Sequence, residues 1–143
     1  MASTRVSCSF DDLAYRGAFE AGSVLAADFH HREHLRLAYV YLCEGSVESA
    51  HRQMRRSIRR FLDRNGVDGT KYHETLTLAW IQAVRHFIEL CPRADSFDGF
   101  CAHDPRLLVA GIMQTHYSPE RLFSPAARIR YLEPDRQAIP IHA

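Results

Sequence analysis

The sequence lacks the features that mark several large protein classes. Its 143 residues contain four cysteines and no CxxC pair, so the spacing does not predict a disulfide framework. No uninterrupted apolar stretch approaches the ~20 residues that span a bilayer. The first residues, MASTRVSCSF, lack the basic and then apolar run of a secretory signal. Together these absences predict a cytoplasmic protein with reduced thiols and no membrane-spanning segment.

The sequence also lacks an excess of positive or negative charge. Eighteen basic and seventeen acidic side chains leave a formal net charge of +1. A dedicated nucleic-acid-binding domain is expected to be strongly basic, so the balance argues against nucleic acid as a partner. The chain also has neither a glycine-rich phosphate loop nor the nucleophile-elbow sequence of a serine hydrolase. A small molecule is the partner class that remains, and the oligomeric state is left open.

Helical periodicity runs through almost the whole chain, and no segment alternates as a confident strand would. We expect an all-α fold, a single compact bundle of about five to seven helices over residues 9–143, preceded by a flexible tail at 1–8. Serine caps, prolines at first helical positions and glycine stops set the boundaries. The predicted helices cover roughly residues 10–21, 29–43, 47–64, 70–90, 96–102, 105–115 and 125–132.

Nine histidines are the unusual feature of the composition. At about 100° per residue, His31 and His34 share the apolar face of their predicted helix, whereas His30 lies roughly 100° away from His31 on the flank. His73 lies on the apolar face of the helix predicted over residues 70–90. We therefore expect His31, His34 and His73 to point inward and His30 to stay outside, with an apolar wall formed by Leu35, Ala38, Leu76 and Trp80.

Three inward imidazoles carry six ring nitrogens, and a buried polar group without a partner costs about 1–3 kcal/mol. A shared metal ion would satisfy one nitrogen of each ring. We therefore predict His31, His34 and His73 as ligands of one transition-metal ion. Imidazoles without carboxylates favour copper or iron, with zinc also possible. For each histidine alone, the alternative is a core residue that is hydrogen-bonded to a backbone carbonyl.

Three further side chains near the predicted site could take part in chemistry. Tyr72, Glu74 and Tyr41 are candidate catalytic residues, acting as acid, base, redox partner or support for a ligand. Glu74 could instead only complement the positive end of its helix. His116 either completes the site or complements a helix end. The resulting hypothesis is a small metal-dependent enzyme, an oxidoreductase acting on a small organic molecule between two helices.

A different hypothesis follows from the helix predicted over residues 47–64. Five arginines share one arc of that helix, opposite its apolar stripe. Such a face could contact an anion or an acidic partner, or it could simply be a solvated surface. The alternative function is therefore a metal-free helical module that binds a partner through these arginines: Arg52, Arg55, Arg56, Arg59 and Arg60.

Four segments taken together resemble a group of short bacterial proteins. The segments are FxHxxHLRLA, KYHETLTxAW, HYSxxxL and a closing EPD, and the resemblance covers roughly residues 10–140. It implies that His31, His34 and His73 belong to a shared pattern, whereas His30 need not. No settled activity comes with this group, so the functional hypotheses depend on the residues themselves.

Overall fold

The computed structural model describes residues 5–143 and confirms the all-α fold. Within this range there is no strand, only an isolated bridge between Val6 and Ala94, and no helix is long and apolar enough to cross a membrane. The α-helices are α1 (Phe10–Ala21), α2 (His31–Glu44), α3 (Val47–Arg64), α4 (Glu74–Leu90), α5 (Phe97–His103), α6 (Pro119–Leu122) and α7 (Pro125–Ile129). Short 3-10 helices cover Ala26–Asp28, Gly69–Lys71, Pro105–Leu108 and Ala110–Thr115.

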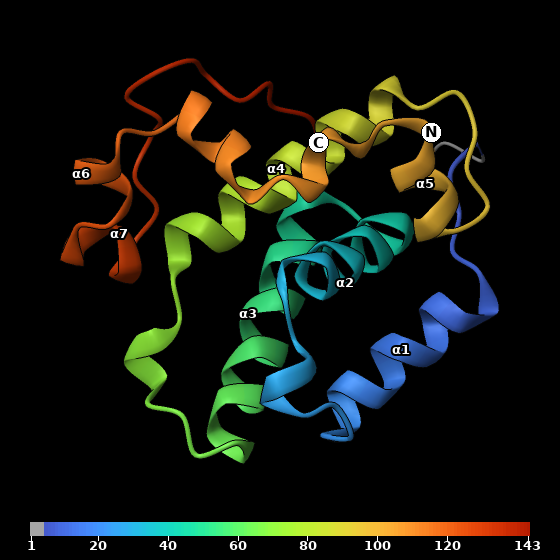
Figure 1. Cartoon of the computed structure of the whole chain (residues 1–143), viewed down its shortest axis with the longest axis horizontal. Coiled ribbons are helices and arrows are strands. Elements are labelled where there is room, and N and C mark those ends of the chain that lie inside the picture. The colour runs from blue at the N-terminus through green and yellow to red at the C-terminus, as the bar shows by residue number, and fades with distance from the viewer. Residues whose placement is uncertain (1–4) are drawn as a thin grey trace.

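Helices α2, α3 and α4 pack against one another and form the centre of the bundle. Helix α1 packs on α2 and α3, α5 packs on α2, and α7 packs on α4 (Figure 1). In Figure 1, α6 and α7 lie on one side of the three central helices and α1 lies on the other.

Helix α2 is buried on every side along its second half. Residues 37–41 are fully inaccessible to solvent, and Leu42 is 3% exposed. The periodicity of the sequence predicts one inward face, but the structure surrounds α2 with α1, α3, α4 and α5. The sequence LAYVYL supports this arrangement because a helix that is apolar around its whole circumference is a buried helix.

Local start and stop signals place most helix ends where the sequence predicts them. Ser9 accepts a hydrogen bond from the Asp12 amide at the start of α1, and Ser46 caps α3 in the same way. Gly22 ends α1 with a left-handed φ of 84°. Three regions differ from the prediction. Helix α4 begins at Glu74 rather than near residue 70, and residues 105–115 form two 3-10 helices instead of one α-helix. Helix α6 has no counterpart among the predicted helices.

The segment before α1 packs against the bundle. Val6 is 7% exposed, and its neighbours exchange backbone hydrogen bonds with Ala94. The hydroxyl of Tyr39 donates to the Ser7 carbonyl at 2.6 Å. Of the tail predicted over residues 1–8, positions 1–4 lie outside the described residues, and residues 5–8 follow this packed path.

One buried carboxylate joins three separate parts of the fold. Asp12 is 2% exposed and accepts hydrogen bonds from the Ser9 amide at 3.0 Å, the Phe97 amide at 2.9 Å and the Arg36 Nε at 3.0 Å. Burial alone would raise its pKa, but these donors outweigh burial and hold the pKa below its ordinary value. Asp12 therefore links the start of α1 to α2 and to the start of α5.

We predict that Asp12→Ala lowers the free energy of unfolding by about 1–3 kcal/mol, because the Phe97 amide loses its partner in the core. Because the folded pKa of Asp12 is depressed, its contribution to stability is present above the unfolded pKa of 3.8 and disappears as pH falls through the lower folded value. Urea unfolding across this acid range measures both effects. Asp11→Ala, at an exposed neighbour, should stay within about 0.5 kcal/mol of the parent.

Candidate functional site

The three histidines predicted as metal ligands line one pocket. Its volume is about 300 Å³, and it lies where the N-terminal ends of α2 and α4 meet α3. Apolar and aromatic side chains supply most of the wall, and the polar groups are mainly imidazoles. The lining residues are Phe29, His30, His31, His34, Ile58, Leu62, Lys71, Tyr72, His73, Leu76, Thr77 and Trp80.

Both ring nitrogens of His73 are already used by the fold. Its Nε2 lies 2.8 Å from the Leu122 carbonyl, and its Nδ1 accepts the Leu76 amide at 3.1 Å, so His73 caps the N-terminus of α4. These partners define a neutral imidazole that is protonated on Nε2. Burial lowers the pKa of His73, against the opposing effect of the Leu122 carbonyl. In this conformation neither nitrogen is open to a metal ion or a substrate.

His31 has one nitrogen bound and one open. Its Nε2 lies 2.9 Å from the carbonyl of Leu107, a residue 76 positions away in sequence. Because a carbonyl only accepts, Nε2 carries a proton, and Nδ1 has no partner in the described chain. The ring packs edge-on against Trp80 with centroids 4.6 Å apart. This contact and the carbonyl fix the orientation of His31 at the wall of the pocket.

The side chain of His34 forms no hydrogen bond to any of the residues 5–143. Its ring packs edge-on against Phe29, with centroids 6.1 Å apart. Burial lowers the pKa of His34 to about 4, and the nearby imidazole of His31 lowers it further. His34 is therefore neutral at physiological pH, with an acceptor and a donor nitrogen that no other part of the described chain satisfies.

These hydrogen bonds bear directly on the predicted metal centre. Within residues 5–143, no group of three or more His, Cys, Asp or Glu side chains is placed so that it could hold a metal ion. His31 and His73 instead satisfy their Nε2 protons on backbone carbonyls. Among the three predicted ligands, the ring nitrogens without a partner in the described chain are Nδ1 of His31 and both nitrogens of His34. The three-histidine ligand set stays a prediction.

Tyr72 connects the pocket to a charged network behind it. Its hydroxyl donates to Oε1 of Glu74 at 2.7 Å, and the same carboxylate accepts from Arg55 Nη2 at 2.8 Å and contacts His51 Nε2 at 3.2 Å. Burial alone would raise the pKa of Glu74, but these partners lower it below its ordinary value. Burial also raises the pKa of Tyr72 to about 12. Glu74 therefore orients Tyr72 from outside the lining of the pocket.

Two candidate residues lie away from the pocket. Tyr41 is fully buried, and its hydroxyl bonds Glu20 at 2.6 Å and Ser57 at 2.7 Å. Nδ1 of His116 lies 2.6 Å from the Gln137 carbonyl, where it fastens the C-terminal segment. The structure therefore does not bring Tyr41 or His116 to the histidines.

The pocket wall also differs from the predicted one. His30, expected outside the site, lies in the lining, whereas Leu35 and Ala38 are fully buried behind it. Leu76 and Trp80 line the pocket as predicted. The residues missed from sequence include Lys71 and Ile58, which enter the lining from the loop before α4 and from α3. Only their side-by-side packing in the bundle brings these positions together.

The arginine face of α3 is divided between internal and external contacts. Arg55 pairs with Glu74, Arg59 lies over the ring of Tyr72 at 4.8 Å, and Arg52 pairs with Glu48. Arg56 and Arg60 are exposed and have no recorded partner within the described chain. Much of the predicted partner surface thus supports the wall of the pocket.

Comparisons of the chain with known protein families, with curated proteins and with solved structures find no match. The resemblance to short bacterial proteins stays a prediction.

We predict that His73→Ala lowers the free energy of unfolding by about 1–3 kcal/mol, because it removes the α4 cap and the partner of the Leu122 carbonyl. His73→Asn restores a cap acceptor and should recover about 1 kcal/mol of the loss. Urea unfolding at neutral pH measures both. His103→Ala, at an exposed residue, should stay within about 0.5 kcal/mol of the parent. Equal stability of His73→Ala and the parent would show that the cap is not needed.

Proposed function

We propose that the histidine pocket is the site of a small-molecule enzyme. In this proposal it binds a small, mostly apolar organic molecule that carries one O–H or N–H group. His34 accepts the hydrogen bond of that group. The observation that carries the proposal is a neutral imidazole without a hydrogen-bonding partner in the described chain, in a pocket that also contains His31, Tyr72 and Trp80.

The size and lining of the pocket indicate the class of molecule. A volume of about 300 Å³ is at the lower end for small-molecule sites, which are mostly apolar and contain a few placed polar groups. Phe29, Leu76 and Trp80 supply apolar surface. Lys71 is exposed at the rim and gives the entrance a positive charge. A flat or aromatic molecule with a single protic group matches this distribution.

The protonation states set the direction of the hydrogen bond to the ligand. His31 presents Nδ1 as an acceptor, because its Nε2 proton is held by the Leu107 carbonyl. His34 is neutral above a pKa of about 4 and can also accept. Two acceptors on adjacent turns of α2 select for a donor in the ligand. When the ligand proton is acidic enough, His34 is the base available to receive it.

Metal-dependent oxidation, the chemistry expected from sequence, is a narrower proposal for the same pocket. Nδ1 of His31 and one nitrogen of His34 would hold a copper, iron or zinc ion, since neutral imidazoles suit all three metals. Such an ion would supply Lewis-acid or redox chemistry when bound. His73 would act by orienting α4 through its cap, and Tyr72 would lie at the pocket wall with its hydroxyl held by Glu74.

In the alternative function, a partner binds the arginine face of α3. The exposed part of this face is smaller than the sequence predicts. Arg56 and Arg60 are its exposed members, whereas replacing Arg55 would also break the ion pair to Glu74. A charge reversal limited to Arg56 and Arg60 therefore tests partner binding without disturbing the pocket.

The proposal is tested with phenol and toluene, which have similar shape and differ in one hydroxyl. Trp80 is the only tryptophan, so its fluorescence reports on the pocket, and ligand-observed NMR gives an independent affinity. We expect phenol to bind more tightly than toluene. His34→Leu should weaken phenol binding by about 10-fold, which corresponds to one hydrogen bond of about 1.4 kcal/mol, and leave toluene binding unchanged.

His103→Leu is the matched control, because His103 is exposed at the end of α5 and does not line the pocket. The proposal is wrong if phenol and toluene bind alike, if neither binds, or if His34→Leu weakens both equally. Metal analysis of the same samples after incubation with copper, iron and zinc tests the narrower proposal. A metal that binds the parent protein but not His34→Leu supports it, and protein that stays metal-free contradicts it.

A further inference from the structure

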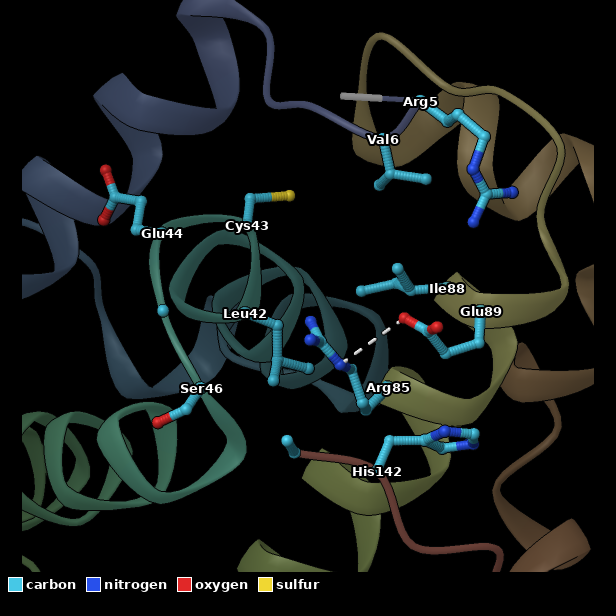
Figure 2. A pocket seen from close by; sticks show the side chains of 12 residues that line it. Arg5, Val6, Leu42, Cys43, Glu44, Ser46, Arg85, Ile88, Glu89 and His142 are labelled. Atoms are coloured by element: carbon cyan, nitrogen blue, oxygen red, sulfur yellow. Dashed lines mark ion pairs between the residues drawn. The ribbon is translucent and has the colours of Figure 1, made fainter. Parts of the chain in front are cut away.

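A second, larger pocket lies at the opposite end of α2. Its volume is about 730 Å³, and its walls come from the N-terminal segment, the end of α2, the last turns of α4 and the C-terminal residues (Figure 2). Cys43 lines this pocket together with Val6, Leu42 and Arg85. Figure 2 shows the Cys43 sulfur directed toward the side of the pocket that carries Val6.

A second cysteine lies against Cys43. The Tyr39 hydroxyl donates a hydrogen bond to the Ser7 carbonyl at 2.6 Å and so holds the N-terminal segment on α2. Tyr39 lies one helical turn before Cys43. The next residue in that segment is Cys8, whose thiol is hydrogen-bonded to the Cys43 sulfur. Both cysteines are partly buried and both are free thiols. The fold thus pairs two sulfurs that lie on different elements of the chain.

The two thiols differ in acidity. The hydrogen bond from Cys8 lowers the pKa of Cys43 and outweighs the opposing effect of burial. The charge of Arg85 also lowers it, and the charge of Asp12 opposes this. The same hydrogen bond, together with burial, raises the pKa of Cys8. Cys43 is therefore the thiol that ionises first. A thiolate, rather than a thiol, is the reactive form toward oxidants.

Arg85 adds a polar feature to the wall beside Cys43. Its Nε is buried and has no hydrogen-bond partner in the described chain. The carboxylate of Glu89 lies 3.7 Å from this Nε, which is beyond hydrogen-bonding distance (Figure 2). The positive guanidinium of Arg85 therefore lines the same pocket as the Cys43 thiol and favours its ionised form.

We propose that Cys43 is an oxidation site for hydrogen peroxide that enters this pocket, and that Cys8 converts the oxidised residue into a Cys8–Cys43 disulfide. In the first step the Cys43 thiolate attacks one peroxide oxygen, the O–O bond breaks, and the other oxygen leaves as water after taking a proton. In the second step the Cys8 sulfur attacks the Cys43 sulfur, the S–O bond breaks, and a second water leaves with the Cys8 proton. Two thiols are oxidised and one peroxide is reduced to two waters.

The test is intact-mass analysis of the full chain treated with one equivalent of hydrogen peroxide. We expect a mass decrease equal to two hydrogen atoms, with peptide mapping placing the bridge between Cys8 and Cys43, and reversal by dithiothreitol. In Cys8→Ser the second step is blocked, so dimedone should trap a sulfenic acid on Cys43. In Cys43→Ser neither product should form.

Cys101→Ser is the matched control, because Cys101 is buried and burial raises its pKa to about 11. Its oxidation should equal that of the parent protein. Iodoacetamide should label Cys43 at least about 10-fold faster than Cys101 in the reduced parent protein, which needs no variant to fold. A bridge between any other pair, equal labelling of the two cysteines, or unchanged mass after peroxide treatment would overturn the proposal.

Discussion

The burial of the second half of α2, residues 37–42, is the constraint on which the rest of the structure depends. A helix enclosed on every side must have each of its polar side chains satisfied by another element, since water is excluded. The Arg36 guanidinium therefore meets Asp12 from α1, the Tyr39 hydroxyl meets the Ser7 carbonyl, and Tyr41 meets Glu20 and Ser57. These bonds orient α1 and the N-terminal segment around the central helix.

The same constraint separates the histidines into two groups. His31 and His73 satisfy their protons on the carbonyls of Leu107 and Leu122, so they support the fold while lining the pocket. His34 lies on the same surface without such a partner. The ring nitrogens of His34 are not among the buried unpartnered atoms of the described chain, so water or a bound ligand can satisfy them. This difference in hydrogen bonding separates His34, the candidate binding group, from His31 and His73, which support the fold.

Much of the fold could be predicted from sequence because its signals are local. Ser9, Ser46 and Gly22 act within one helical turn, so their caps can be recognised without tertiary information. The apolar spacing also places His31, His34 and His73 on inward faces. The partners of these histidines could not be predicted in the same way, because the carbonyls of Leu107 and Leu122 lie 76 and 49 residues away. A sequence pattern does not distinguish a ring nitrogen that binds a metal ion from one that is hydrogen-bonded to a distant carbonyl.

The fold depends on His31 and His73 donating their Nε2 protons to backbone carbonyls, whereas the ring of His34 is neutral and has no hydrogen-bond partner in the described chain. Long-range ¹⁵N–¹H NMR of histidine rings tests this arrangement most directly, because ring nitrogen shifts distinguish the two neutral tautomers from the cation. The account predicts Nε2–H tautomers for His31 and His73 at neutral pH, and a His34 ring that becomes protonated only near pH 4. A His34 that titrates near its ordinary value of 6.5, or an Nδ1–H tautomer at His73, would contradict the account.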